Sequence, residues 1–284
     1  VDFLRPFPGF GNISFIEPSA SSNYHSLQTS LQRRYTRGLL VGVNYTWSKV
    51  LGTQTNDLPG INGFGAPHNI DNRRANYGVL DFDRPHNFNV NFVWDLPKAT
   101  GNSGLGYALN GWQLSGIYRY TTGGPFNVGA NISGLSGYGL TGTQQVEGAR
   151  IVLLKNPGSG SSSDPYRMFD TSAFAASTVG SQGFESGRNF LRVGPINSWD
   201  LALSKEFRVK EKVKFEIRLD AFNAFNHTQF DGVNSTANFA SPGSTAITNL
   251  PFNASGALTN VNGFGAVNSV RPPRNMQLSA RFEF

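Results

Sequence analysis

Arg274-Asn275-Met276-Gln277-Leu278-Ser279-Ala280-Arg281-Phe282-Glu283-Phe284 is the stretch that decides the fold of this chain. From residue 275 on, polar and apolar residues alternate strictly, and the apolar ones are Met276, Leu278, Ala280, Phe282 and Phe284. Because side chains of a β-strand point alternately to opposite faces, a strand here has one apolar face and one polar face. This pattern is typical of a strand that faces lipid on one side and a watery lumen on the other.

The composition favours all-β structure with long loops. Among 284 residues, Gly occurs 33 times and Phe 23 times, while only 15% are charged. Glycine and aromatic residues with modest charge are typical of strands and turns rather than of helices. No run approaches the 18 apolar residues of a transmembrane helix, which leaves a membrane barrel of short, half-apolar strands open.

Charge and cysteine content exclude several classes of protein. The formal net charge is +6, but the basic residues are spread along the chain and form no basic run, so we expect no nucleic-acid partner. Cysteine is absent, which excludes a disulfide framework and thiolate metal sites. Its absence also suits a chain that crosses an oxidising periplasm.

Seven segments carry the period-two alternation of strands. They are residues 24–35, 39–49, 86–96, 111–121, 198–207, 213–223 and 274–284. On the first strand we expect Tyr35 to share the apolar face with Leu27 and Leu31. Residues 149–155 read as a short local strand, and the segment 122–155 could supply an eighth strand to the sheet.

The connections between these segments alternate in length. Short ones lie at 36–38, 97–110 and 208–212, and long ones at 50–83, 122–195 and 224–273. Outer-membrane barrels have short periplasmic turns and long extracellular loops, so this alternation gives every strand a direction. A loop as long as 122–195 with no packing of its own would be unusual in a compact soluble domain.

The inward face is predicted to be wet. Asn87, Asn89 and Asn91 alternate with apolar residues, and buried amides are costly unless each finds partners, whereas a hydrated lumen satisfies them. A symmetric hairpin would also place Glu206 opposite Lys214. The full set of predicted lumen-facing polar residues is Asn87, Asn89, Asn91, Arg119, Asp200, Glu206, Lys214, Glu216, Arg218 and Asp220.

Large aromatic residues mark the two ends of the outward face. Trp112 and Tyr120 lie on one face, and at about 3.3 Å per residue with a tilt near 40° they span roughly 20 Å, close to the height of a lipid-facing band. The predicted aromatic girdle comprises Tyr45, Trp47, Tyr118, Tyr120 and Trp199 at the outer end and Trp94 and Trp112 at the inner end.

Candidate chemistry in the sequence is weak. Asp81, Asp83 and His86 are close in sequence, but they lie where a loop enters a strand, a place that favours turn and rim hydrogen bonds over a metal site. No Gly-x-Ser-x-Gly elbow, phosphate-binding loop or metalloprotease helix occurs. We therefore expect no catalytic residue, metal or cofactor, and no enzymatic activity.

Several strings, in order along residues 24–284, resemble the barrel of TonB-dependent receptors of the Oar-like type. They are Phe82-Asp83-Arg84-Pro85-His86-Asn87-Phe88, Trp94-Asp95-Leu96-Pro97, Gly111-Trp112-Gln113-Leu114-Ser115-Gly116, Thr122-Gly123-Gly124-Pro125-Phe126, Gly187-Arg188-Asn189-Phe190-Leu191-Arg192, Phe222-Asn223-Ala224-Phe225-Asn226-His227-Thr228-Gln229-Phe230 and the terminal strand. Each string alone is weakly specific, and their order and spacing carry the resemblance.

The resemblance implies a plugged barrel of about 22 strands in the bacterial outer membrane. This chain would then be its C-terminal part, an antiparallel portion of about seven to eight strands that lacks the plug and the segment contacting TonB. Implied partners are outer-membrane lipid, the TonB complex through the missing N-terminal region, and an unknown extracellular ligand. The terminal strand resembles the signal that barrel-assembly machinery recognises, carried by the apolar residues quoted above.

Three functions remain open from the sequence. The first is the barrel part of a TonB-dependent receptor that imports, or in some relatives exports, a large solute. The second is a small self-contained outer-membrane barrel of about eight strands, an adhesin or anchor, which requires a signal peptide directly before Val1. The third is a secreted soluble β-domain that binds carbohydrate or protein, which requires the apolar strand faces to be buried by protein.

Overall fold

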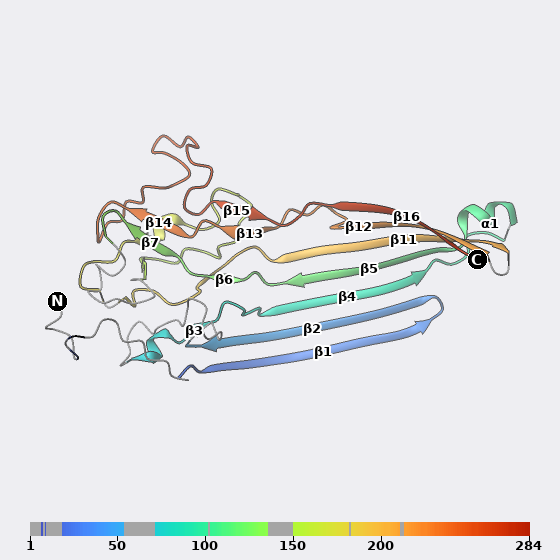
Figure 1. Ribbon diagram of the computed structural model, residues 1–284, viewed down its shortest axis with the longest axis horizontal. Coiled ribbons are helices and arrows are strands. Elements are labelled where there is room, and N and C mark those ends of the chain that lie inside the picture. Colours follow the sequence, from blue (N-terminus) through green and yellow to red (C-terminus); the bar gives the residue numbers. More distant parts are fainter. Residues whose placement is uncertain are drawn as a thin grey trace.

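The computed structural model describes residues 7, 9, 19–53, 72–101, 103–135, 150–181, 183–210 and 213–284. Residues 54–71 of the predicted loop 50–83 therefore lie outside the described residues. The fold is built on one large antiparallel sheet (Figure 1). Its seven long strands are, in spatial order, β1 (Ser22–Thr36), β2 (Leu39–Gly52), β4 (His86–Asp95), β5 (Trp112–Thr121), β11 (Ile196–Lys210), β12 (Val213–Phe222) and β16 (Asn275–Glu283).

The predicted all-β, antiparallel fold is confirmed. All seven predicted strands are present, each with its bounds within a few residues of those expected from the alternation. Strands of ten residues reach about 33 Å at about 3.3 Å per residue, enough to cross an apolar band of about 25 Å when tilted. The strand β3 (Gly78–Val79) pairs with the last two residues of β2, at the end of the sheet away from the β1–β2 turn. We call this end the outer end of the sheet.

The sheet is open in the described part of the chain, with β1 and β16 at its two edges. Both edge strands run from the broad end of the molecule toward the end that holds helix α1 (Ser103–Leu109) in Figure 1. The turns β1–β2, β4–β5 and β11–β12 lie at this α1 end, whereas the long connections lie at the other. No helix in the described residues is long and apolar enough to cross a membrane.

Cross-strand register separates one polar face from one apolar face. Residues directly opposite each other on neighbouring strands point to the same face. A row on the polar face runs through Ser30, Asn44, Asn89, Arg119 and Ser198. A row on the apolar face runs through Leu39, Trp94, Leu114, Leu203, Leu219 and Leu278.

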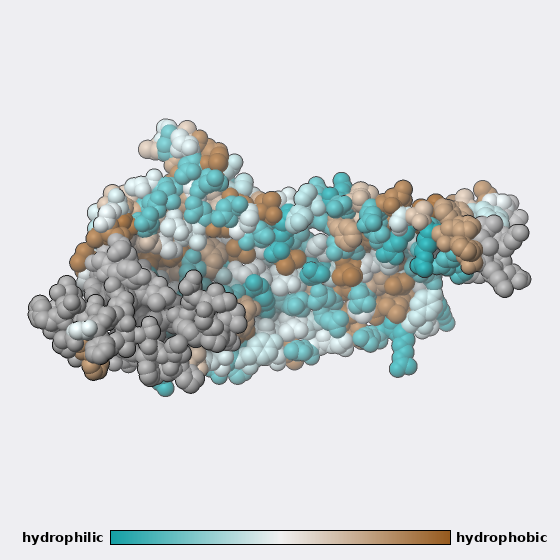
Figure 2. All heavy atoms as spheres, in the orientation of Figure 1, coloured by the Kyte–Doolittle hydropathy of each residue, from teal (hydrophilic) through white to brown (hydrophobic). Residues whose placement is uncertain are grey.

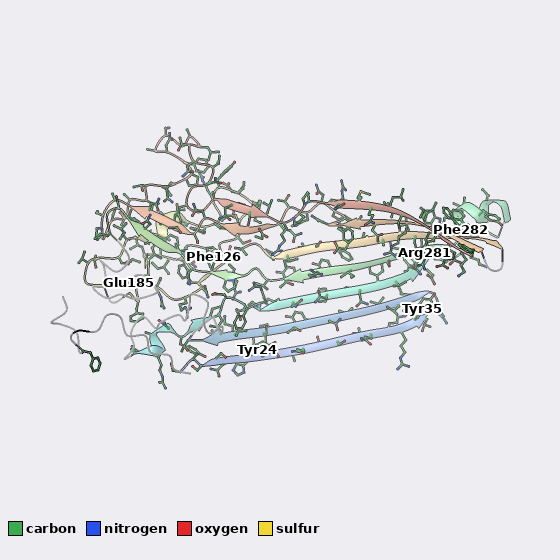
Figure 3. All side chains as sticks on the ribbon, in the orientation of Figure 1. Tyr24, Tyr35, Phe126, Glu185, Arg281 and Phe282 are labelled. Carbon is green, nitrogen blue, oxygen red and sulfur yellow. The ribbon has the colours of Figure 1, made fainter. Side chains whose placement is uncertain are left out.

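Two register details differ from the sequence prediction. Tyr35 lies near the end of β1 (Figure 3). A register shift between Arg33 and Thr36 turns it toward the polar face, where its hydroxyl donates to the Asp95 carboxylate. The placement of Tyr35 on the apolar face is therefore wrong, because one extra residue in a strand exchanges its faces. A second shift near the β11–β12 turn places Glu206 opposite Glu216 rather than opposite Lys214.

The long connections 122–195 and 224–273 fold together at the outer end of the sheet. We call their described parts the cap. Four small sheets form it with the 3₁₀ turn Thr171–Ala173, and β7 and β14 pair in parallel. The paired strands are β6 (Pro125–Phe126) with β10 (Leu191–Arg192), β7 (Gly129–Ile132) with β14 (Thr236–Phe239), β8 (Val152–Leu153) with β9 (Phe174–Ala175), and β13 (Phe230–Val233) with β15 (Val267–Val270).

The cap has a hydrophobic core of its own. Phe174, Phe239 and Phe264 are fully buried, and the Phe169 and Phe264 rings meet at 5.1 Å between centroids. Burying one such side chain stabilises a fold by about 1.5–3 kcal/mol, so several of them suffice to order these connections. The expectation that the long connections have no packing of their own is therefore wrong. The cap strands also pair with one another, so that 122–155 adds no described strand to the large sheet.

Candidate functional site at the junction of cap and sheet

A buried carboxylate lies where the cap meets the outer end of the sheet. Asp83 is fully buried, and one of its oxygens accepts a hydrogen bond of 2.6 Å from the backbone N–H of Val50 on β2. Its other oxygen accepts from the guanidinium of Arg192 on β10 and lies 3.7 Å from the Lys49 ammonium. Burying a carboxylate is costly unless it is paired and hydrogen-bonded, and here its partners come from the sheet and the cap.

Two arginines fasten the backbone around this carboxylate. Arg84 Nη1 donates to the carbonyl oxygens of Asp81 and Asp83, at 2.9 Å each. Arg192 Nη1 donates to the carbonyls of Asp83, at 3.0 Å, and Gly123, at 3.3 Å. The guanidinium group offers five donors in a fixed plane, which lets one side chain hold several backbone segments at once.

Asn189 adds a second connection between cap and sheet. Its Nδ2 donates to the carbonyl of Val79, at 2.7 Å, and to the Asp81 carboxylate, at 2.5 Å. Its backbone has a φ of 53°, in the left-handed region that asparagine tolerates better than most residues, and its N–H donates to Asn127 Oδ1 at 2.6 Å. Next to it, Arg188 Nη1 donates to the Thr53 carbonyl at 2.9 Å.

The two glycines after β5 are required by close approach. A Cβ on Gly123 would lie 1.8 Å from the carbonyl oxygen of Val193, and one on Gly124 would lie 2.9 Å from Arg84 Nη2. Only a residue without a side chain allows the chain to pass between Arg84 and the segment after β10. These contacts give a physical reason for Gly123-Gly124 within the string Thr122-Gly123-Gly124-Pro125-Phe126.

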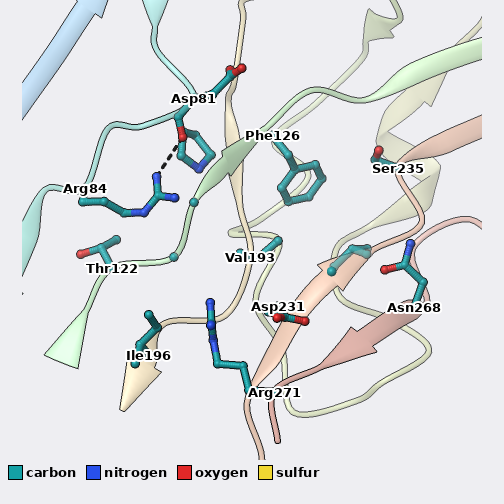
Figure 4. Close-up of a pocket in the computed structure, with 15 residues that line it drawn as sticks. Asp81, Arg84, Thr122, Phe126, Val193, Ile196, Asp231, Ser235, Asn268 and Arg271 are labelled. Carbon is teal, nitrogen blue, oxygen red and sulfur yellow. Dashed lines mark hydrogen bonds between the residues drawn. The ribbon is translucent and has the colours of Figure 1, made fainter. Parts of the chain in front are cut away.

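A pocket of about 410 Å³ opens beside this junction (Figure 4). The sheet side contributes Asp81 and Arg84, and the cap side contributes Asp231 and Arg271, with Phe126 as an apolar wall. Burial, together with the nearby cations Arg192 and Arg271, lowers the pKa of Arg84 below its ordinary value, although Asp83 and Asp81 act in the opposite direction. The guanidinium nevertheless stays charged at neutral pH.

The three residues weighed as a metal site have separate partners. His86 Nδ1 lies 2.9 Å from the Tyr45 hydroxyl on β2. Asp83 is held by the cations described above, and Asp81 accepts from Asn189. Within the described residues, no group of three or more His, Cys, Asp or Glu side chains is arranged to hold a metal ion.

All ten predicted lumen-facing residues lie on the polar face of the sheet. Oppositely charged neighbours pair there: Arg218 lies 2.9 Å from Asp220, and Lys214 lies 3.5 Å from Glu206, as a diagonal rather than a direct neighbour. Asn89 donates to Asn87 Oδ1 at 2.8 Å. The polar rows therefore form a hydrogen-bonded surface that leads from the junction along the sheet.

Aromatic rings gather on the apolar face near the junction. Tyr118 stacks on Trp199 with ring centroids 4.6 Å apart, and Phe88 meets Tyr118 edge-on at 5.9 Å. Tyr45 contacts Phe88 at 6.5 Å, and Tyr120 is the cross-strand partner of Phe88. Trp47, opposite His86, is 44% exposed, so that much of its ring remains uncovered. The predicted outer girdle residues thus lie together on one face.

The inner end of the apolar face holds a residue that the alternation did not single out. Lys205 points to this face, yet it is only 4% exposed, because its ammonium donates to the Asn110 carbonyl and lies 5.2 Å from the Trp112 ring. The centre of the Phe207 ring lies 4.7 Å from the same ammonium. Trp94, the remaining predicted inner girdle residue, is 40% exposed opposite Leu114.

The apolar residues of the terminal strand are largely uncovered by protein. Leu278 is 72% exposed and Phe282 59%, and both lie on the apolar face, opposite Leu219 and Phe215 of β12. Figure 2 shows hydrophobic residues gathered at this end of the sheet, near α1. Met276, Ala280 and Phe284 belong to the same exposed strand or its end.

The sequence did not predict the contacts that join cap and sheet, because the partners are about a hundred positions apart. Hydrogen bonds at the rim were expected for Asp83, but not its pairing with Arg192. Arg192 and Asn189 occur only within one of the strings quoted above, and Arg271 belongs to none of them.

The sheet has long antiparallel strands, with short turns at one end and long connections at the other, and it has one polar and one apolar face. These features define the class of outer-membrane β-barrel proteins. The family model for the outer membrane beta barrel domain matches residues 1–277, and the chain belongs to this family. Its place is therefore the bacterial outer membrane. A comparison with curated proteins found no match.

Proposed function

We propose that this chain is the barrel part of a TonB-dependent outer-membrane receptor, a transport protein rather than an enzyme, that takes up or exports a large solute. The proposal rests on the ordered set of receptor-like strings in the sequence, together with the direction of the two edge strands. β1 and β16 both run from the cap toward the α1 end.

Two edges that run in the same direction cannot close on each other as an antiparallel pair. Bacterial outer-membrane barrels have an even number of antiparallel strands, and the sheet has seven long ones. An unpaired strand edge in lipid leaves backbone groups without hydrogen bonds, each at a cost of several kcal/mol. Further strands must therefore complete the wall. One further strand would complete a barrel of eight and fifteen would complete one of about 22, so the sheet alone fits both. The order and spacing of the receptor-like strings favour the larger barrel, which encloses a plugged lumen.

The cap and the polar face support a route for a solute. The cap stands at the end of the sheet that carries the long connections, and the pocket opens at its base. Long connections are extracellular in outer-membrane barrels, so in this proposal the cap faces outward. From there the charged rows of β11 and β12 continue toward the periplasmic turns. In this proposal the cap supplies the ligand surface, and the polar rows line the wall.

Three partners are proposed: outer-membrane lipid, the TonB complex and the barrel-assembly machinery. Outer-membrane lipid covers the apolar face, and the TonB complex acts through an N-terminal plug region. Barrel-assembly machinery recognises the terminal strand, with Phe282 and Phe284 as its aromatic signal. Replacing both by Ala should lower the amount of receptor in outer membranes, while the same changes at Phe169 and Phe174 in the cap should leave insertion itself intact.

The sequence upstream of Val1 in the source DNA tests the class of protein. The proposal expects an in-frame plug region preceded by a signal peptide. A signal peptide joined directly to Val1 would overturn the receptor and favour a small self-contained barrel.

Transport itself is tested in the source bacterium. The growth medium of the wild type is compared by mass spectrometry with that of a strain lacking the full-length gene. A solute should remain in the medium, or be missing from it, in the deletion strain. The full-length gene should restore the wild-type profile, and a version without the TonB-contacting segment should not. Identical profiles in all strains would contradict energised transport.

A further inference from the structure

Arg271 lies in the wall of the junction pocket, and its side chain has an unsatisfied donor among the described residues. Its backbone N–H donates to the Gln229 carbonyl at 2.9 Å, which fixes the chain just after β15. Its Nε is buried, yet it has no hydrogen-bond partner in the described part of the protein. A buried donor on a cation that lacks an acceptor is costly, so this group is suited to a partner from outside the chain.

Arg84 lies on the opposite wall of the same pocket (Figure 4). Its Nη1 donates to two backbone carbonyls, which carry no formal charge to balance the guanidinium. Burial and the repulsion from Arg192 and Arg271 lower its pKa, as expected for cations that crowd one another. Arg192 already holds Asp83, so within the described residues this carboxylate forms no direct ion pair with Arg84 or Arg271.

In the described part of the chain, the two carboxylates of the pocket form no direct ion pair with these arginines, although Asp81 acts on Arg84 through space. Asp81 accepts from Asn189, and Asp231 accepts from the Ser269 hydroxyl at 2.6 Å. Among the described residues, neither carboxylate forms an ion pair with Arg84 or Arg271. Both arginines are partly exposed, so solutes can reach them.

We propose that this pocket binds the oxyanion of a small ligand, a carboxylate or a phosphate, with Arg271 as its main contact and Arg84 as the second cation. Guanidinium groups donate only, and their planar donors match the paired oxygens of these anions. A volume of about 410 Å³ lies within the range of small-molecule sites. The site goes beyond the proposed function, because binding here requires neither TonB nor transport.

The test uses the full-length receptor, purified in detergent without any energy source. Inorganic phosphate and succinate are titrated separately by calorimetry into the wild type, Arg271→Gln and Arg167→Gln. Arg167 supplies the matched control, since it lies in the same cap, 4.4 Å from the Phe252 ring, and outside the pocket lining. We expect Arg271→Gln to weaken binding at least about tenfold, the effect of one lost charge-assisted contact, and Arg167→Gln to leave it unchanged.

Asp231→Asn adds a change in the opposite direction. This substitution removes a negative charge from the pocket wall and should strengthen anion binding a few-fold.

The two titrations distinguish the chemical source of the ligand: a response to succinate alone identifies a carboxylate ligand, and a response to phosphate alone identifies a phosphorylated one. Binding of neither anion by the wild type overturns the proposal, as does equal binding by Arg271→Gln and the wild type.

A second measurement covers the case in which Arg271→Gln does not fold. The wild-type receptor is treated with phenylglyoxal, which modifies accessible guanidinium groups, and the modified sites are identified by mass spectrometry. Phosphate or succinate should protect Arg271 and leave Arg167 reactive. Equal modification of Arg271 with and without both anions contradicts the site. Failure of uptake in the source bacterium leaves these binding results standing, so the two proposals fail separately.

Discussion

Asp83, just before β4, accepts a charged hydrogen bond from Arg192, 109 residues later in the chain. The carboxylate has no exposure to solvent, whereas the Arg192 side chain is 22% exposed. This contact, with the Val50 N–H and the Lys49 ammonium, fixes the base of the cap on the outer end of the sheet. This buried ion pair is therefore one of the contacts that set the orientation of the proposed ligand surface, beside those of Asn189 and Arg188.

Replacing Asp83 by Asn should loosen the cap. The substitution keeps the shape of the side chain but leaves Arg192 without its counter-charge, and we expect a loss of about 2–4 kcal/mol in the free energy of unfolding. The value is below that for a fully buried pair because Arg192 is partly exposed. Denaturant unfolding of the full-length receptor in detergent, with protease cleavage of the cap as a second readout, measures it.

Asp170→Asn is the matched control for that variant. Asp170 forms a pair of 2.7 Å with Lys155 in the cap, but both side chains are about half exposed. Exposed pairs contribute less than about 1 kcal/mol. Equal losses in the two variants would show that the buried pair does not hold the cap.

Gly123→Ala should also disturb the junction. The new methyl group would meet the Val193 carbonyl, a backbone atom that cannot move alone, so we expect a loss of about 1–3 kcal/mol or more. Gly187→Ala is the control, because a methyl group added there would have no other atom within 4 Å. Thermal unfolding of both variants gives the comparison, and equal midpoints would contradict the close approach.

The strands of the sheet could be read from the sequence because their signal is local. In β16, for example, Met276 to Glu283 alternate without interruption, and lipid and water enforce that pattern residue by residue. The polar rows followed from the same alternation. The displaced Tyr35 marks the limit, since a bulge of one residue leaves almost no trace in composition.

The cap and its pocket could not be predicted in this way. Its strands are two to four residues long, too short for a period to show. Its buried residues, such as Phe174 and Phe264, come from distant segments, and the junction joins positions near 80 to positions near 190. Such contacts are set by tertiary packing, for which one sequence carries no local signal.

The Asp170–Lys155 pair should show a pH dependence. The hydrogen bond from Lys155, aided by Ser172, lowers the pKa of Asp170. A carboxylate with a lowered pKa in the folded state stabilises the fold fully above its unfolded pKa of about 3.9, and this stabilisation is lost as the pH falls through the folded value. The small difference between wild type and Asp170→Asn should therefore be present at pH 7 and vanish well below pH 4. Unfolding midpoints at several pH values test it, and a difference that persists in acid would contradict the assignment.

Leu278→Arg and Gln277→Arg compare the two faces of the terminal strand. Leu278 is 72% exposed on the apolar face, opposite Leu219, where an arginine facing lipid should cost about 2–4 kcal/mol. Gln277 lies on the polar face opposite Asp220, where an arginine meets water and a carboxylate. We therefore expect Leu278→Arg to reduce the folded, heat-modifiable receptor in outer membranes and Gln277→Arg to leave it near the wild-type amount. The reverse order would mean that the apolar face of β16 does not face lipid, and the two faces of the whole sheet would exchange their roles.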